Sequence, residues 1–148
     1  MQSFGITFAI NLRENKPQRK DFIMAEKRDV YKCEECGNIV GVLHASGGKL
    51  ACCGQDMKHL VPNTVDAAVE KHIPIIEKDG ENYTVTVGST LHPMTDEHYI
   101  EFIQLITKAR TYTVHLDPGK DPKASFSVHC EVLSARAYCN LHALWKSE

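Results

Sequence analysis

The sequence has no long apolar run and no strong excess of charge of either sign. No apolar stretch approaches the roughly 20 residues that a membrane-spanning helix needs, although 43% of the 148 residues are hydrophobic. The formal net charge is -2, so bulk electrostatics does not favour nucleic acid or anionic membranes as partners. These absences predict a globular protein that binds neither nucleic acid nor membrane and that buries one core.

A secretory signal is also missing. The opening residues lack a basic start, a sustained apolar stretch and a small-residue cleavage site. We therefore expect a cytoplasmic location, where thiols stay reduced. The six cysteines are unevenly spread, with four in one short stretch and two far downstream. Such clustering favours metal binding over disulfides.

Composition divides the chain into three parts. Residues 1–23 hold no cysteine or histidine and include a polar, basic run. We expect them to be a tail, either a disordered extension or the product of an upstream start, since Met24 opens a second plausible beginning. Residues 24–60 are rich in glycine and cysteine, and a domain this short needs a metal or a partner surface to fold. We expect residues 61–148 to form the second, catalytic domain.

Beyond residue 73 the sequence alternates between apolar and polar residues. The segments YTVTV, TYTVHL and SFSVHCEV have the period of two that is typical of half-buried strands. Cys130 falls on the apolar face of the third segment, which predicts a buried small hydrophobe. The segment YIEFIQLI is apolar in both registers, which fits a strand or a short helix, and its neighbours favour a strand. The predicted fold class is mainly β, with a small metal-stapled domain followed by an antiparallel β-sandwich.

Four cysteines in two pairs make the first candidate site. Cys33 and Cys36 are separated by two residues, Cys52 and Cys53 are adjacent, and a glycine follows each pair. The first spacing lets two thiolates from one turn reach one ion, and the glycines let backbone approach the sulfurs closely. Adjacent side chains diverge, so the second pair must be strained to converge. Thiolate tetrads hold zinc or iron with the same geometry, so the residues alone leave the metal open.

Four histidines and one cysteine make the second candidate site. Each stands at an expected strand edge or turn, where side chains from separate strands converge. Imidazoles with one thiolate suit iron, copper or zinc, and five ligands leave a sixth position open for a small molecule. The five residues are His72, His92, His98, Cys139 and His142. The remaining histidines are expected at the surface or satisfied in the core: His44, His59, His115 and His129.

Around these motifs the sequence resembles the desulfoferrodoxins, a family of two-domain superoxide reductases. The similar segments are DVYKCEECGNIV, ACCG, NTVDAAVEKHIPIIEK, HPMTDEHYIEFI and YCNLHALWK, within residues 27–146. The resemblance implies a desulforedoxin-like iron site at the four cysteines and an immunoglobulin- or fibronectin-like sandwich. It implies a second iron with four equatorial histidines and Cys139 as the axial thiolate. It also implies a homodimer that is re-reduced by a small electron carrier such as rubredoxin.

The resemblance further assigns a reaction, the detoxification of superoxide under oxidative stress. Iron at the open site gives one electron to superoxide, and two protons complete hydrogen peroxide. Lys71, next to His72, is expected to attract the anionic substrate and to help organise a proton-donating water. Glu70 is expected to cap the oxidised iron after the product leaves. Apart from the resemblance, both side chains are ordinary solvated charges.

Two other classes of function stay open at this point. A pure electron-transfer protein would use both irons as relays and bind no substrate, although an open coordination position would then be a liability. A zinc-stapled binding module would be colourless and redox-silent. Metal analysis combined with visible spectra of oxidised and reduced protein separates the three classes.

Overall fold

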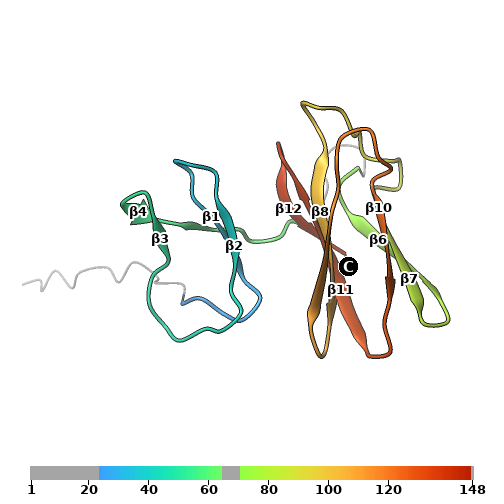
Figure 1. The fold of residues 1–148 in the computed structure, drawn as a ribbon, viewed down its shortest axis with the longest axis horizontal. Helices are drawn as coiled ribbons and strands as arrows, with labels where there is room; N and C mark the ends of the chain where they lie inside the picture. Colours follow the sequence, from blue (N-terminus) through green and yellow to red (C-terminus); the bar gives the residue numbers. More distant parts are fainter. Residues whose placement is uncertain (1–23, 65–70, 148) are drawn as a thin grey trace, which may run out of the picture.

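The computed structural model describes residues 24–64 and 71–147. Within these two ranges every regular element is a strand, and no helix there is long and apolar enough to cross a membrane. Figure 1 shows a smaller group of strands, blue to green, beside a larger layered group. We call residues 24–60 the small unit and residues 71–147 the sandwich. The expected tail, 1–23, and Glu70 lie outside the described residues.

The sandwich consists of two antiparallel sheets. One has three strands in the order β10-β7-β6, and the other has four strands in the order β12-β11-β8-β9. In chain order these strands are β6 Pro74–Asp79, β7 Asn82–Val87, β8 Ile100–Thr107, β9 Thr111–His115, β10 Lys123–Ser127, β11 Val132–Cys139 and β12 Ala143–Lys146. The predicted mainly β class and sandwich are confirmed, and the ambiguous segment YIEFIQLI forms β8.

The period-two alternation produces the core between the two sheets. Along β7, Tyr83, Val85 and Val87 are buried while the threonines between them are half-buried. The strand β8 differs because both of its faces are covered. Its Ile103 and Leu105 belong to the core of the sandwich, whereas Phe102 packs in a second cluster that includes residues of the small unit. This double coverage explains why its sequence is apolar in both registers.

The small unit holds a three-stranded sheet and a hairpin. The sheet has the order β2-β1-β5, with β1 Val30–Lys32, β2 Ile39–Gly41 and β5 Lys58–His59. The hairpin pairs β3 Ala51–Cys52 with β4 Gln55–Asp56. Strands of two or three residues bury little surface on their own, which agrees with the expectation that this unit needs a staple.

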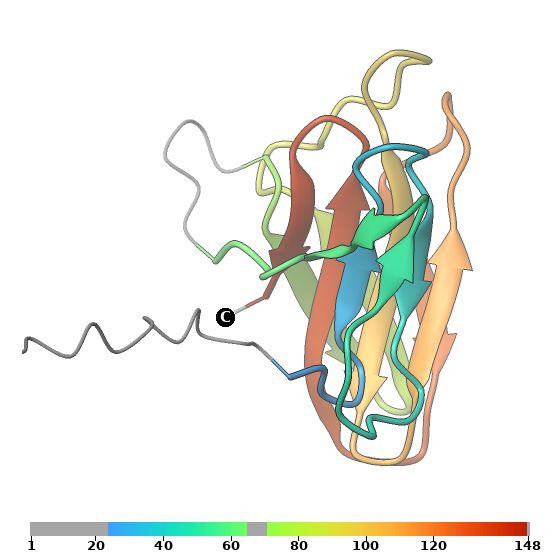
Figure 2. The ribbon, with the colours of Figure 1, turned by 90° about the vertical axis from the view of Figure 1, so that its left-hand side faces the viewer.

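The small unit packs against the four-stranded sheet of the sandwich, as the side view in Figure 2 shows. Lys32 of β1 donates a hydrogen bond of 2.9 Å from Nζ to the hydroxyl of Tyr138 in β11. After β5, Asn63 forms a parallel bridge with Trp145 of β12. We call the contact between the two units the seam, and its apolar centre consists of Val30, Leu60, Phe102, Tyr138 and Leu144. Burial of each such side chain contributes about 1.5–3 kcal/mol relative to exposure.

The expected burial of Cys130 is wrong. The strand β10 ends at Ser127, and the chain bends at residues 129–130, so Cys130 is only half-buried. The exposed His129 lies 2.7 Å from Glu81 at this bend. The alternating pattern therefore continues in the sequence past the point where the strand stops. Of the four histidines expected at the surface or satisfied in the core, His44, His115 and His129 are exposed and His59 is half-buried.

Candidate metal centres

The four-cysteine cluster comes from two turns that face each other. Cys33 and Cys36 flank the turn after β1, where the amide of Cys33 donates to the carbonyl of Asn38 at 2.8 Å. Cys52 and Cys53 lie at the tip of the β3-β4 hairpin. All four Sγ atoms lie within 4.8 Å of one another, and the Cys36 to Cys52 separation is 3.6 Å. The four predicted cysteines are thus close enough to share one ion.

The adjacent cysteines converge because the hairpin tip is left-handed. Cys53 has φ 53° and Gly54 has φ 78°, and these two residues connect Cys52 to its partner Gln55. Positive φ at both central residues is the type I′ turn that suits a two-residue hairpin. A residue with a side chain pays about 1 kcal/mol or more in this conformation, which is the strain expected for the pair.

The thiols of this cluster differ in acidity. Backbone N–H groups, first that of Cys36 and then that of Glu35, lower the pKa of the Cys33 thiol to about 7 despite burial. Contacts with the side chains of Cys36 and Cys52 raise the pKa of the Cys53 thiol to about 12. One thiolate therefore forms readily near neutral pH, while a full set of four needs a bound cation to offset the mutual repulsion.

The histidine/cysteine cluster gathers its members from three separate parts of the sandwich. His72 precedes β6, His92 and His98 lie in the connection between β7 and β8, and Cys139 and His142 flank the turn between β11 and β12. All five potential ligand atoms lie within 4.8 Å of one another. Cys139 is completely buried and His142 is exposed. The thiol therefore reaches the cluster from the core, where His92 is also buried, and His142 lies on the solvent side.

The turn between β11 and β12 explains how Cys139 and His142 come together. Cys139 pairs with Ala143 across the hairpin, which leaves a three-residue loop. Ala143 has φ 64°, and a left-handed residue at this place is typical of three-residue hairpin loops. The Sγ of Cys139 lies 3.5 Å from Nδ1 of His142, and that Nδ1 lies 3.0 Å from Nε2 of His72. His142 thus presents its δ nitrogen to the cluster.

His92 and His98 carry buried nitrogen atoms without partners in the described protein. Nδ1 of His92 lies 2.6 Å from the carbonyl of Pro93, so it donates its proton there and leaves Nε2 as an acceptor. The Nε2 atoms of both histidines are buried without a hydrogen bond. Burial lowers the pKa of His92 to about 4 and also lowers that of His98. Neutral imidazoles with orphaned nitrogens directed at a shared point fit a metal ion.

Both parts of the chain match models of one protein family. Residues 25–60 match the model described as desulfoferrodoxin, N-terminal domain, and residues 64–148 match the one described as desulfoferrodoxin. A desulfoferrodoxin from Syntrophotalea carbinolica is 54% identical over 125 residues, which cover 84% of this chain and 99% of the relative. The chain belongs to the desulfoferrodoxin family. A second desulfoferrodoxin, from Desulfarculus baarsii, is 51% identical with the same coverage of both chains.

A solved structure shares the fold over most of this chain. It is that of the superoxide reductase from Treponema pallidum, with a TM-score of 0.67 and 31% identity, covering 81% of this chain and 96% of that one. The four-cysteine cluster and the histidine/cysteine cluster are consistent with two iron sites. Four thiolates in one place and imidazoles with one thiolate in the other are donor sets that iron accepts.

Asn140, in the turn between Cys139 and His142, positions part of the histidine/cysteine cluster but was not predicted from the sequence. Its Oδ1 accepts a hydrogen bond from the amide of Tyr99 at 3.0 Å, and its Nδ2 donates to the carbonyl of Glu97 at 2.9 Å. These two bonds hold the segment on either side of His98 against the β11-β12 turn. The only sign of this role in the sequence is that a polar residue stands between two predicted ligands in a turn.

Trp145 is the second supporting residue that the sequence analysis missed. Its ring stacks on that of His72, with centroids 4.7 Å apart and an interplanar angle of 21°. Its Nε1 donates to the carbonyl of His142 at 2.9 Å. One side chain of β12 therefore contacts the ring of one clustered histidine and the backbone of another. Its position three residues after His142 gave no pattern that separates it from an ordinary core aromatic.

Lys71 lies at the same end of the sandwich as the histidine/cysteine cluster. Burial is the main cause that lowers the pKa of His98, and the charges of His142, His72 and Lys71 add to it. Lys71 is therefore close enough to act electrostatically on the cluster. The backbone of Lys71 also lies against Gly88, where an added Cβ would be 2.7 Å from the Lys71 carbonyl oxygen. Glu70, the other predicted catalytic residue, lies outside the described residues.

Proposed function

We propose that this chain is a superoxide reductase that converts superoxide to hydrogen peroxide at the histidine/cysteine cluster. The observation that carries the proposal is the convergence of four imidazoles and one buried thiol, with ligand atoms within 4.8 Å of one another. A solved relative of the same fold is named a superoxide reductase, which supports the assignment. When bound there, iron supplies one electron and an open coordination position.

Some residues of the site are proposed to bind the iron, and others orient the residues that bind it. We propose His72, His92, His98, His142 and Cys139 as the ligands of the catalytic iron. The carbonyl of Pro93 fixes the tautomer of His92, and Trp145 fixes the plane of His72. Because Cys139 is completely buried, its thiolate is kept from solvent behind the site. Substrate therefore approaches from the exposed histidine side.

We further propose that Lys71 steers superoxide toward the open side. The chain has a net charge of -2. An anion is therefore attracted only to places where the local positive charge exceeds the effect of this negative net charge. The electrostatic contact between Lys71 and His98 supports a position beside the site. We propose that Glu70 caps the oxidised iron after product release, and that an external donor resembling rubredoxin restores the reduced state.

The remaining features of the proposal concern organisation. We propose a tail at 1–23, a four-cysteine iron domain at 24–60 and a catalytic domain at 61–148. In the iron domain, the proposed ligands of the second iron are Cys33, Cys36, Cys52 and Cys53. The family models meet between residues 60 and 64, which supports this division. We also propose a homodimer located in the cytoplasm; size-exclusion chromatography with light scattering tests the dimer.

The experiment that tests the function combines metal analysis with rapid kinetics. We expect about two irons per chain and consumption of superoxide with formation of hydrogen peroxide when a reductant is supplied. An electron-transfer protein would cycle both irons and leave superoxide unconsumed. Zinc in both clusters of protein made with ample iron would contradict the proposal.

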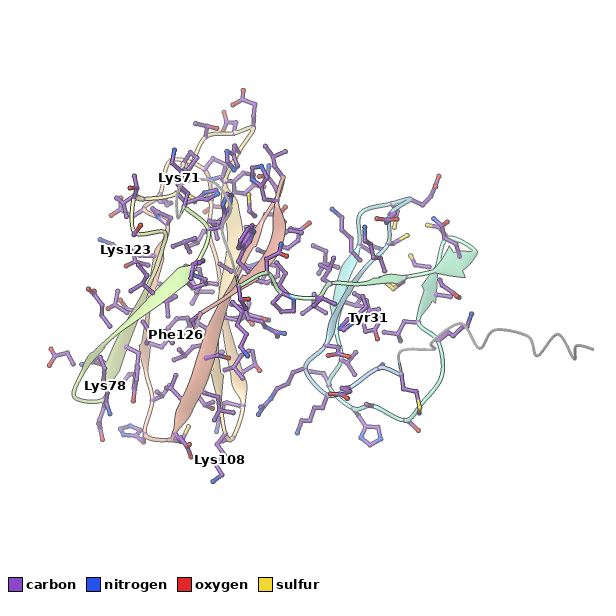
Figure 3. The ribbon with its side chains drawn as sticks, turned by 180° about the vertical axis from the view of Figure 1, so that it is seen from behind. Tyr31, Lys71, Lys78, Lys108, Lys123 and Phe126 are labelled. Atoms are coloured by element: carbon purple, nitrogen blue, oxygen red, sulfur yellow. The ribbon has the colours of Figure 1, made fainter. Side chains whose placement is uncertain are left out.

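A salt series on reduced protein tests Lys71. Lys71→Ala should slow the bimolecular reaction by about tenfold at low ionic strength and flatten its salt dependence, because steering by one charge is screened by salt. Lys108→Ala is the matched control, since Lys108 is an exposed lysine at the opposite end of the sandwich (Figure 3). If both variants match the unmodified chain in rate and salt slope, Lys71 does not steer the substrate.

A further inference from the structure

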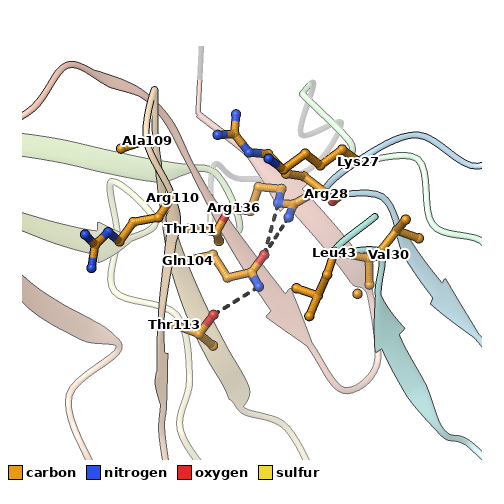
Figure 4. A pocket seen from close by; sticks show the side chains of 12 residues that line it. Lys27, Arg28, Val30, Leu43, Gln104, Ala109, Arg110, Thr111, Thr113 and Arg136 are labelled. Carbon is orange, nitrogen blue, oxygen red and sulfur yellow. Dashed lines mark hydrogen bonds between the residues drawn. The ribbon is translucent and has the colours of Figure 1, made fainter. Parts of the chain in front are cut away.

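A cavity of about 340 Å³ lies at the seam. Figure 4 shows its walls, with Val30 and Leu43 from the small unit on one side and Gln104 and Thr113 from the sandwich on the other. Four of its lining residues are basic and none of them is acidic: Lys27, Arg28, Arg110 and Arg136. The chain as a whole has more acidic than basic residues, so this local excess is unusual. We call this space the seam cavity.

Arg136 is the central cation of the seam cavity and is only 7% exposed. Its Nε and Nη2 donate to Oε1 of Gln104 at 3.1 and 2.7 Å, and its Nη1 donates to the carbonyl of Arg28 at 2.9 Å. A guanidinium has five N–H donors, so two remain beyond these three bonds. Within the described residues Arg136 forms no ion pair. Burying a positive charge against neutral acceptors alone is costly.

The environment of Arg136 leaves its charge only partly balanced. Burial lowers the pKa of Arg136, the charge of Asp29 raises it, and that of Arg28 lowers it again. The carboxylate of Asp29 already accepts a hydrogen bond from the amide of Glu26 at 2.7 Å and lies 3.4 Å from Nε2 of His59. Asp29 is therefore shared among several donors, and it forms no ion pair with Arg136 within the described residues.

The other cations surround the seam cavity at different depths. Arg28 is fixed at the wall because its Nη2 donates to the carbonyl of Thr107 at 2.8 Å. Lys27 and Arg110 are exposed, and the guanidinium of Arg110 lies 5.7 Å from the ring centroid of Tyr112. Two guanidinium groups held by hydrogen bonds and two exposed cations along the lining form an arrangement that favours a negatively charged guest.

We propose that the seam cavity binds a small divalent oxyanion, of the phosphate or dicarboxylate kind, between the small unit and the sandwich. The guanidinium fork matches the oxygen geometry of both kinds of anion. The volume lies at the lower end of the range of about 300–1,000 Å³ that small-ligand sites occupy. An anion here neutralises a buried charge and contacts both units at once. This site does not depend on the proposed reduction of superoxide.

Calorimetric titration of the metal-loaded full chain tests the proposal. Inorganic phosphate and succinate serve as the two probes, each at constant ionic strength set with sodium chloride, and the visible spectrum verifies that iron is retained. We expect saturable binding with one site per chain for at least one probe, and a higher midpoint of thermal unfolding with that probe. The probe that binds more tightly identifies the kind of oxyanion. Absence of saturable binding for both overturns the proposal.

Paired double variants locate the binding without disturbing the buried arginine. Lys27→Gln with Arg110→Gln should weaken binding by about tenfold or more, because each removes a charge-assisted contact. Lys78→Gln with Lys123→Gln removes the same charge from the far sheet of the sandwich (Figure 3) and should change affinity by less than about twofold. Equal weakening in both pairs would mean nonspecific attraction and overturn the site. Superoxide reduction should stay unchanged in both pairs.

Discussion

The four-cysteine cluster and the histidine/cysteine cluster reach a similar density of ligands by different means. The first uses two turns within one short segment, and three of its four cysteines remain at least partly exposed. The second joins residues from His72 to Cys139 and beyond, with one histidine and the thiol buried. The four-cysteine cluster depends on local structure alone, whereas the histidine/cysteine cluster forms only when the strands of the sandwich have come together.

This difference has a thermodynamic consequence for each unit. The strands of the small unit are two or three residues long, so its metal supplies a large part of its stability. The sandwich has its own core of fully buried side chains, so it supplies stability to its metal site. Loss of metal should therefore unfold the small unit, whereas the sandwich should stay folded with an empty metal site. The following variants test that contrast, from the largest expected effect on catalysis to the smallest.

Removing the buried thiol should have the largest effect. Cys139→Ser keeps the shape of the side chain but replaces the thiolate by a hydroxyl, a poor ligand for iron, at a completely buried position. Superoxide reduction should fall by at least about 100-fold, while one iron per chain remains at the four cysteines. Iron content and stopped-flow rates measure the two effects. Loss of both irons would contradict the independence of the clusters.

Gly88→Ala should damage the histidine/cysteine site without touching a ligand. An added Cβ would lie 2.4 Å from the Thr90 carbonyl oxygen and 2.7 Å from that of Lys71, so the backbone leading to His72 must shift. We expect a loss of about 1–3 kcal/mol in unfolding free energy together with weakened iron retention.

Gly80→Ala is the matched control for the previous variant. Gly80 also has positive φ, at 60°, but an added Cβ meets nothing within 4 Å. It should lose about 1 kcal/mol from backbone strain and keep its iron. Chemical denaturation and release of iron to a chelator compare the pair. Equal iron release from both variants would rule out a special role for the contact between Gly88 and Lys71.

Asn140→Ala should have an intermediate effect. It removes both side-chain hydrogen bonds to the segment around His98, so we expect a loss of about 2 kcal/mol in unfolding free energy and faster iron release. Asn140→Asp keeps the acceptor for the amide of Tyr99 but loses the donor to Glu97. Its rate of iron release should lie between those of the unmodified chain and Asn140→Ala. If aspartate releases iron as fast as alanine does, the bond to Glu97 alone carries the effect.

Cys53→Ser should have the smallest effect on catalysis and a large one on the small unit. The four-cysteine iron should be lost, and amide exchange should increase throughout 24–60. Pre-reduced protein should still react with superoxide at a rate within about twofold, since the clusters share no residue. A collapse of that rate would show that the small unit contributes to catalysis through the seam.

The sequence predicted most of the fold and the members of both clusters, but not the residues that support them. Clustered cysteines and period-two alternation are local signals, so the four-thiol set and strands such as β7 could be predicted directly. The five-membered set needed the family resemblance as well, because its members come together only through sheet topology. Asn140 and Trp145 act through hydrogen bonds and stacking across strands, which no spacing encodes. Cys130 was mispredicted because a pattern does not show where a strand ends.

The contact between Trp145 and His72 makes the protein its own optical reporter. The chain holds a single tryptophan, and its ring lies 4.7 Å from a ring of the histidine/cysteine cluster. Emission excited at the red edge of aromatic absorption therefore arises from one indole beside one metal site. Iron bound there should quench that emission, and the total iron content then gives the occupancy of the four-cysteine site by difference. The occupancy of the two centres can thus be followed separately in unlabelled protein.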